Sequence, residues 1–232
     1  REFPYPAAES PYYGDGDASA EKRRIREAYC ASVSMVDESV GRVLHHLEDK
    51  GLLDDTIIVY ASDHGEMLQD KGFYQKTLPY ESSVRIPLVI RYPERFKGGT
   101  RDGRFCDLMD LFPTLLELAG VPAESLPGKR ALPFDGASLV SDATAQRTHQ
   151  HFACVTGRDR WTAVRDRKWK YVYFYNGGAE QLFDLEEDPR ELRNLVRIGQ
   201  APPQVLDELR RRVLAYETSH GPAGCVVDGR LA

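Results

Sequence analysis

The stretch from Thr56 to Gly65 constrains the fold of this chain more than any other. Its first five residues are all β-branched or aromatic, which predicts a strand buried on both faces, as in a parallel sheet. The strand leads into Ser62-Asp63-His64-Gly65, and in open α/β sheets ligands bind at the carboxyl ends of strands. An adjacent carboxylate and imidazole at such an edge can bind a metal ion. The alternative is that Asp63 caps a following helix and His64 lies on the surface.

Composition excludes several classes of protein. With 232 residues, 41% hydrophobic and 29% charged, the chain is typical of one large or two modest globular domains. The net charge of -5 gives no reason to expect nucleic acid or a membrane as a partner, and no apolar run approaches the length of a membrane span. The four cysteines lie far apart, without zinc spacing, and are too few for a disulfide scaffold. The absence of an initiator Met and of a signal-like segment predicts a processed or truncated N-terminus.

A long helix is predicted from about Ser19 to Lys50, after an irregular segment over residues 1–17. Apolar side chains recur every three or four residues along one face, and Gly51 provides a natural end. Helix, short turn and buried strand form half of a βαβ unit whose first strand is not in this sequence. We therefore expect the isolated chain to aggregate or to associate with its other half. His45 and His46 are predicted to be surface residues.

The rest of the chain divides into two parts that differ in their predicted secondary structure. A polar stretch up to Lys76, a strand over 84–92 with Pro87 near its start, and a helix over 107–120 are predicted before a loop-rich passage to about 142. Taken alone, Lys76 is a solvated loop lysine. Short strands over 151–155, 161–165, 169–175 and 181–185 then predict a half-exposed antiparallel sheet, followed by a short helix after Asp188 and a helix over 205–218. We predict two domains, 1–142 and 143–232.

Seven segments in order give the chain a specific resemblance. They are Tyr29–Gly41, Asp55–Gly65, Gln75-Lys76, Arg85–Ile90, Asp110–Gly120, Val164-Arg165 with Lys168–Tyr171, and Leu182–Pro189 with Leu192–Leu195. Together they resemble the C-terminal half of a formylglycine-dependent sulfatase of the alkaline phosphatase superfamily. The resemblance implies an α/β fold: the C-terminal part of an alkaline-phosphatase-like α/β/α sandwich, then a small antiparallel sheet with a C-terminal helix.

The resemblance also implies roles for three residues. Asp63 and His64 match the family's second pair of metal ligands, and Lys76 matches the lysine that contacts the sulfate and stabilises the leaving ester oxygen. One divalent ion is expected. Calcium is the first choice and manganese or magnesium are the alternatives; an imidazole ligand also suits iron. Many relatives have Asn where this chain has His64. Histidine occurs there in relatives that hydrolyse phosphonate monoesters and phosphodiesters, which makes those esters the rival substrates.

One departure from the family limits what the chain can do alone. The Cys-x-Pro-x-Arg motif that yields the formylglycine nucleophile is absent from this sequence, as is the first pair of aspartate ligands. Cys154 and Arg158 share the spacing but lack the proline, so Cys154 is predicted to be a buried strand cysteine. We expect hydrolysis of a sulfate ester of a small molecule or glycan, with the nucleophile supplied by the missing N-terminal half. The alternative from another class is a non-catalytic binding or regulatory fragment.

Overall fold

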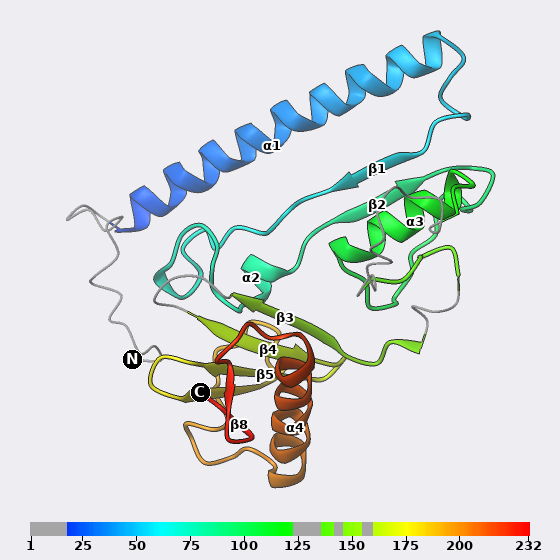
Figure 1. The fold of residues 1–232 in the computed structure, drawn as a ribbon. Coiled ribbons are helices and arrows are strands. Elements are labelled where there is room, and N and C mark those ends of the chain that lie inside the picture. Colours follow the sequence, from blue (N-terminus) through cyan, green and yellow to red (C-terminus); the bar gives the residue numbers. More distant parts are fainter. Residues whose placement is uncertain (1–17, 123–135, 142–145, 155–159) are drawn as a thin grey trace. The chain divides into compact units, whose positions relative to one another are not determined.

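The computed structural model describes residues 18–122, 136–141, 146–154 and 160–232, and Figure 1 shows their fold. They form two compact units. Of the described residues, those up to Lys76 and those of Arg85–Asp102 belong to the N-terminal unit, while Thr77–Val84 and those from Gly103 onward belong to the C-terminal unit. The predicted irregular segment over 1–17 and most of the predicted loop before residue 142 lie outside the described residues. The predicted domain boundary at residue 142 stays a prediction.

The N-terminal unit begins with helix α1, Ala18–Asp49, which confirms the long helix. The helix ends within one residue of the predicted end at Lys50. Gly51 adopts a left-handed φ of 65°, and the Leu52 N–H donates to the Leu47 carbonyl at 2.8 Å. His45 and His46 are exposed, as predicted. Among the described helices, none combines the length and apolar character needed to cross a membrane.

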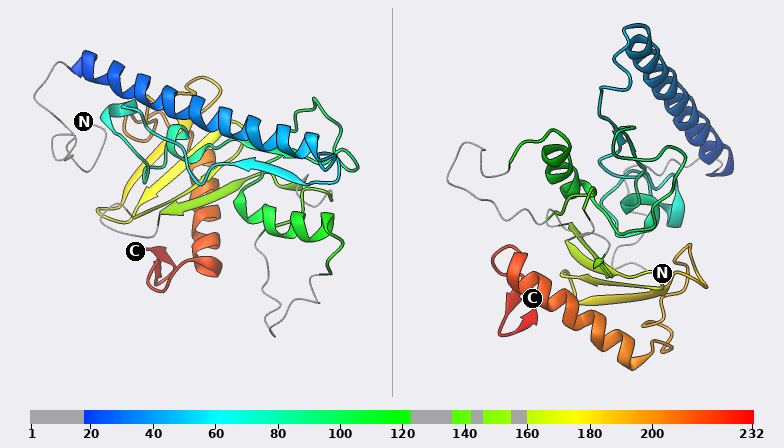
Figure 2. Two further views of the ribbon diagram at one scale, coloured as in Figure 1. Left: turned by 90° about the horizontal axis from the view of Figure 1, so that it is seen from above. Right: turned by 90° about the vertical axis from the view of Figure 1, so that its right-hand side faces the viewer.

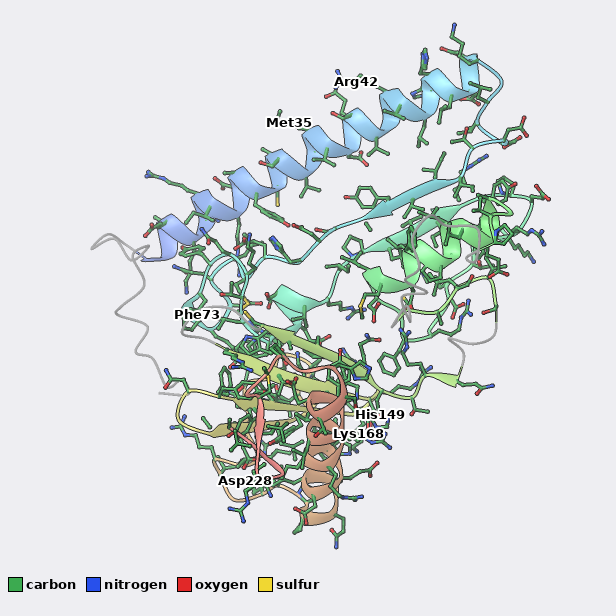
Figure 3. All side chains as sticks on the ribbon, in the orientation of Figure 1. Met35, Arg42, Phe73, His149, Lys168 and Asp228 are labelled. Carbon is green, nitrogen blue, oxygen red and sulfur yellow. The ribbon has the colours of Figure 1, made fainter. Side chains whose placement is uncertain are left out.

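The apolar face of α1 is largely open. Tyr29, Val33, Val36 and Val43 are 42–60% exposed. Figure 3 shows side chains projecting along the whole length of the helix, with Met35 and Arg42 labelled. A row of exposed apolar side chains on a helix is a surface that associates with another apolar surface.

We therefore predict that the purified chain self-associates through this face. Sedimentation velocity should show a mass above 26.2 kDa that rises with concentration. Val33→Glu combined with Val36→Glu should shift it toward the monomer, because charge on the face opposes association. Ala31→Glu, about half a helical turn away, is the matched control and should leave the mass unchanged. A well-dispersed monomer of the unaltered chain would contradict the prediction.

The strand that leads to the predicted metal pair is β1, Ile58–Ala61, and its partner is β2, Leu88–Arg91. They pair antiparallel, with Ile58 opposite Arg91 and Ala61 opposite Leu88. The prediction of parallel pairing is wrong for this pair. Burial on both faces is wrong as well, since Tyr60 is 40% exposed. A β-branched run has the same composition in either kind of sheet, so the sequence could not distinguish them.

The C-terminal unit is built on one sheet, ordered β3-β4-β5-β6 and antiparallel throughout. Its strands are Gln150–Cys154, Trp161–Arg165, Trp169–Phe174 and Ala179–Asp184, followed by helix α4, Pro203–His220 (Figures 1 and 2). One face carries Val164, Tyr171 and Leu182 against Leu209 and Val213 of α4. This confirms the predicted small antiparallel sheet and C-terminal helix.

The predicted half-exposed sheet is wrong in one respect, because both faces of β5 are covered. Tyr171 is buried against α4, while Val172 and Phe174 on the other face pack with Trp161 and with Val84 of the short helix α2, Glu81–Val84. Lys170 occupies a position that the alternation assigns to the solvent side, and it is fully buried. A lysine predicts solvent at this position, but the fold places the carboxylates of Glu81 and Glu191 there instead.

The remaining elements are short. They are η2 (Asp70–Gly72), η3 (Leu108–Asp110), α3 (Leu111–Leu118), β7 (Val226–Val227) and β8 (Arg230–Leu231). The predicted strand over 84–92 is shorter, because Val84 belongs to α2 and Pro87 directly precedes β2. The predicted short helix after Asp188 is wrong. That segment forms turns, in which Asp188 Oδ2 accepts from the Arg193 N–H at 2.7 Å.

The start of α3 is fixed by a buried carboxylate. Asp110 is fully buried and pairs with Arg147 through two contacts of 2.8 Å. Its Oδ1 also accepts from the Ala137 N–H. Burial alone would raise the pKa of Asp110, but these bonds hold it below its ordinary value. Asp110 therefore ties the predicted 107–120 helix to the segments that carry residues 137 and 147.

His151 is the most strongly perturbed histidine among the described residues. Its ring stacks on Tyr216 of α4, with centroids 4.6 Å apart. Burial, with His149, Arg212 and His220 nearby, lowers the pKa of His151 to about 4, although the Glu217 carboxylate opposes the shift. The folded C-terminal unit therefore favours the neutral ring.

We predict a corresponding loss of stability in acid. The folded-state pKa lies below the unfolded value of about 6.5, so the contribution is complete above pH 6.5 and is lost as the pH falls toward 4. The loss is at most about 3.5 kcal/mol, since the pKa falls from 6.5 to about 4 and one pKa unit corresponds to about 1.4 kcal/mol. His151→Phe keeps the ring stacking and should make the urea midpoint depend less on pH between pH 6.5 and 4. His46→Phe on α1 should leave that pH dependence unchanged. Equal slopes in all three proteins would contradict this.

Candidate functional site

Asp63 and His64 follow β1 directly and lie side by side. The Asp63 Oδ1 atom accepts a hydrogen bond from the His64 N–H at 2.9 Å, and its Oδ2 atom lies 3.4 Å from His64 Nε2. The Asp63 side chain is 82% exposed and that of His64 36% exposed. Residues 62–65 contain no helix, so the alternative in which Asp63 caps a helix is wrong. Both side chains are therefore accessible at least in part.

The His64 ring is oriented by its own backbone neighbour. Nδ1 lies 2.7 Å from the Gly65 carbonyl oxygen, which can only accept, so the neutral ring carries its hydrogen on Nδ1. The lone pair is then on Nε2, the nitrogen beside the Asp63 carboxylate. Metal-ligating histidines are typically held in this way. The pair therefore suits a divalent cation, with one oxygen and one nitrogen ligand.

These two residues do not complete a coordination shell. Among the described residues, no group of three or more His, Cys, Asp or Glu side chains is placed to hold a metal ion. Hard cations such as calcium take six to eight oxygen ligands, so a cation held by this pair would need further ligands.

Lys76 lies at the end of the loop that follows the pair, and it is exposed. The loop is closed on itself by two bonds. Gln75 N–H donates to Glu66 Oε1 at 2.5 Å, and Met67 N–H donates to the Gln75 carbonyl at 2.8 Å. These bonds fix the residue before Lys76 next to the residue that follows Gly65. The loop thus returns Lys76 toward the end of β1 where Asp63 and His64 lie.

The backbone of this loop is strained. Leu68, Gln69, Lys71, Gln75 and Thr77 all have positive φ, between 43° and 82°, although none is glycine. Such conformations cost about 1–3 kcal/mol each and cluster at ligand-binding and catalytic sites. Two of them flank Lys76, and Thr77 is β-branched, for which this region is least favourable. The structure keeps the chain around Lys76 in a conformation that its residues do not favour by themselves.

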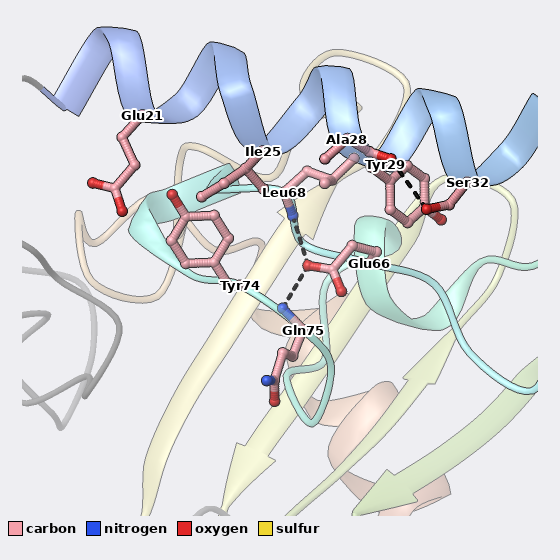
Figure 4. A pocket seen from close by; sticks show the side chains of 9 residues that line it. All are labelled: Glu21, Ile25, Ala28, Tyr29, Ser32, Glu66, Leu68, Tyr74 and Gln75. Atoms are coloured by element: carbon pink, nitrogen blue, oxygen red, sulfur yellow. Dashed lines mark hydrogen bonds between the residues drawn. The ribbon is translucent and has the colours of Figure 1, made fainter.

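A pocket of about 390 Å³ lies between the first turns of α1 and this loop (Figure 4). It is lined by Glu21, Ile25, Ala28, Tyr29, Ser32, Glu66, Leu68, Tyr74 and Gln75. Glu66 reaches from the pocket wall to the Leu68 and Gln75 N–H groups, as the dashed lines show. On the helix side, the Arg26 guanidinium donates to the Leu68 carbonyl at 3.3 Å.

Glu66 is the site residue that sequence reasoning missed. One of its carboxylate oxygens accepts from two backbone N–H groups nine and two residues away, so it closes the loop between the metal pair and Lys76. A carboxylate next to Gly65, just beyond the strand, was the available signal, but it does not reveal which N–H groups it accepts from. Cys154 lies in β3 and is half-buried, consistent with a strand cysteine, while Arg158 lies outside the described residues.

Two family models match the chain. The sulfatase model matches residues 2–121, and the model of the N-sulphoglucosamine sulphohydrolase C-terminal region matches residues 69–219. Choline-sulfatase of Rhizobium meliloti (strain 1021) is 38% identical over 198 residues, which are 82% of this chain and 37% of that protein. The chain therefore spans well under half of this relative.

Two solved structures have the same fold. A protein in complex with its substrate D-glucosamine-2-N,6-O-disulfate matches with a TM-score of 0.77 at 29% identity, over 90% of this chain and 43% of its own. The phosphonate monoester hydrolase of Agrobacterium radiobacter matches with a TM-score of 0.69 at 30% identity, over 88% and 46%. The predicted α/β fold class is thereby confirmed. The chain belongs to the sulfatase family, within the alkaline phosphatase superfamily.

Proposed function

We propose that this chain supplies half of the active site of a sulfuric ester hydrolase. The observation that carries the proposal is the pair at the end of β1, in which His64 Nε2 lies 3.4 Å from Asp63 Oδ2 with its lone pair available. The closed loop that returns Lys76 toward the same strand end supports it. Family membership supplies the reaction class, since its models are those of sulfatases and a sulphohydrolase.

Each of the three residues has a physical task. Asp63 and His64 would hold a divalent cation, which when bound neutralises sulfate oxygens and activates the nucleophile. Lys76 would place its ammonium against the sulfate and the leaving ester oxygen, where negative charge develops as the S–O bond breaks. The nucleophile would be a formylglycine hydrate from a Cys-x-Pro-x-Arg motif in the N-terminal half of the protein, which also supplies the remaining ligands.

Calcium is the ion we propose, with manganese or magnesium as alternatives. An Asp oxygen and several oxygen ligands from elsewhere would suit calcium, while the His64 nitrogen widens the choice toward manganese. His64→Asn would replace that nitrogen by an amide oxygen. It should increase the preference for calcium over manganese, measured by competition of the two ions for the complete enzyme.

The substrate we propose is a sulfate ester of a small molecule or glycan. Matched proteins are a choline-sulfatase and a protein solved with a sulfated glucosamine. The second candidate function is hydrolysis of phosphonate monoesters or phosphodiesters, because a phosphonate monoester hydrolase has the same fold at 30% identity.

Rates on matched esters test the proposal. The enzyme that contains this chain together with its nucleophile-bearing half should be assayed on an aryl sulfate and an aryl phosphonate with the same leaving group. We expect the larger kcat/KM on the sulfate, and loss of both rates on metal removal. A larger kcat/KM on the phosphonate would favour the second function. Rates that are zero on both esters, with metal present and the nucleophile formed, would refute both.

A further inference from the structure

The residue before Lys76 is bound through both of its backbone polar groups. The Gln75 N–H donates to Glu66 Oε1 at 2.5 Å, and the Gln75 carbonyl accepts from the Met67 N–H at 2.8 Å. Figure 4 shows the first of these bonds as a dashed line. Glu66, Met67, Gln75 and Lys76 all belong to the N-terminal unit, so the arrangement lies within one compact unit.

The carboxylate of Glu66 holds Gln75 in a conformation that a glutamine does not favour by itself. Gln75 has a φ of 64°, in the left-handed region that few residues other than glycine adopt. A hydrogen bond from an N–H to a carboxylate is stronger than one between neutral groups, so it offsets part of this strain. Without that bond, Gln75 has a reason to relax toward the extended or right-handed region. Such a rotation redirects the Cα–Cβ bond of the next residue, Lys76.

The rest of the loop has its own support. The Leu68 N–H donates to the same Glu66 oxygen at 3.2 Å, and the Arg26 guanidinium of α1 donates to the Leu68 carbonyl at 3.3 Å. Arg26 also lies 3.9 Å from Asp70. These contacts hold the beginning and the middle of the loop, whereas the Glu66 carboxylate also reaches the residue next to Lys76. Glu66 therefore connects the two ends of the loop.

We infer that Glu66 is a positioning residue for Lys76 in ester hydrolysis. The inference rests on the proposed function, in which the Lys76 ammonium meets charge on the leaving oxygen. A lysine side chain is long and flexible, so its ammonium reaches a single point only if the backbone that carries it is fixed. Displacing a charged group by about 1 Å from its transition-state position can cost about 100-fold in rate.

Two other roles for Glu66 make different predictions. If Glu66 only stabilised the fold, its loss would lower the amount of active enzyme and reduce every rate by the same factor. If Glu66 were a further metal ligand, its loss would lower the metal content. Loss of positioning acts through Lys76 alone, and it matters most for esters with poor leaving groups, because these need the ammonium most.

The test uses Glu66→Ala, Lys76→Ala and the double variant, each in the enzyme assembled with its nucleophile-bearing half. Aryl sulfates whose phenol pKa values differ supply the leaving-group series. Glu66→Asp is a milder second variant, because it keeps the carboxylate but shortens its reach by one methylene. Glu66→Gln keeps an acceptor oxygen at the same reach. Glu27→Ala is the matched control, since Glu27 lies on α1 in the same unit with its side chain 69% exposed.

We expect Glu66→Ala to lower kcat/KM by about 100-fold for the poorest leaving group and far less for the best, with the metal content unchanged. Glu66→Asp should give a smaller loss with the same leaving-group dependence, and Glu66→Gln should restore most of the rate. Glu27→Ala should keep the unaltered leaving-group dependence. In the Lys76→Ala background, Glu66→Ala should have no further effect.

Three results would overturn the inference and leave the role of Lys76 intact. They are equal losses in both backgrounds, losses independent of the leaving group, and a loss of rate that follows a loss of metal. A Lys76→Ala enzyme with an unchanged rate would overturn both the inference and the role of Lys76 in the proposed function.

Discussion

Asp63→Ala should lower kcat/KM for an aryl sulfate about 100- to 1,000-fold in the assembled enzyme. A catalytic metal supplies several kcal/mol of transition-state stabilisation, and each 1.4 kcal/mol is a factor of ten in rate. Asp63 is one of the two ligands proposed among the described residues, and its carboxylate lies 3.4 Å from His64 Nε2. Removing it should also lower metal affinity, which elemental analysis after dialysis against a weak chelator would measure.

The matched control is Asp54→Ala. Asp54 is as exposed as Asp63 and belongs to the same unit, but it pairs with Arg91 at 2.6 Å, at the other end of β1. Its loss should leave both metal content and kcat/KM within about twofold, because a surface ion pair contributes at most about 1 kcal/mol to stability. If Asp63→Ala retained full metal content and rate, the assignment of the pair as ligands would be wrong.

Lys170→Met should destabilise the C-terminal unit by about 3–5 kcal/mol, the usual cost of removing one member of a buried ion pair. Lys170 is fully buried in β5, with its Nζ atom 2.7 Å from Glu191 and 3.1 Å from Glu81. Burial alone would raise the pKa of Glu81, but Lys170 and then Arg165 hold it below its ordinary value. Methionine fills the volume of Lys170 but removes the ammonium that lies 2.7 Å from Glu191, which is 2% exposed.

Urea unfolding followed by tryptophan fluorescence measures this effect in one unit. The chain has two tryptophans, Trp161 and Trp169, and both lie in the small sheet. Lys168→Met is the control, since the Lys168 side chain is 43% exposed and its solvent-screened ion pairs should contribute little to stability. Adding Glu191→Gln to Lys170→Met should restore part of the loss. Equal midpoints for the Lys170 and Lys168 variants would contradict the account.

Local patterns predicted the elements well where the period was clear. The 3.6-residue repeat gave α1 within one residue at each end, and the alternation of aromatic residues gave the small antiparallel sheet. The pairing of β1 could not be predicted in the same way. A run such as Ile-Ile-Val-Tyr is compatible with parallel or antiparallel neighbours, and only β2, which lies about 30 residues later, decides between them.

The candidate site divides along the same line. The sequence placed Asp63 and His64 at a strand end, and the structure adds that Gly65 orients the ring. The sequence could not predict that Glu66 closes the loop or that Trp161 binds Thr77. These hydrogen bonds join residues that are 9 and 84 positions apart, so they depend on tertiary packing. The burial of Lys170 could not be predicted for the same reason. A lysine is buried favourably only when carboxylates lie beside it, and Glu81 and Glu191 are far from Lys170 in the sequence.

The central claim is that this chain carries Asp63, His64 and Lys76 as half of a hydrolytic site that needs a second, nucleophile-bearing half. The most direct test is the rate of aryl sulfate hydrolysis by a preparation that mass analysis shows to contain this chain alone, before and after a polypeptide with a Cys-x-Pro-x-Arg motif is added. We expect no turnover without the second polypeptide, and turnover that depends on Asp63 with it. Turnover by the chain alone that Asp63→Ala abolishes would contradict the claim.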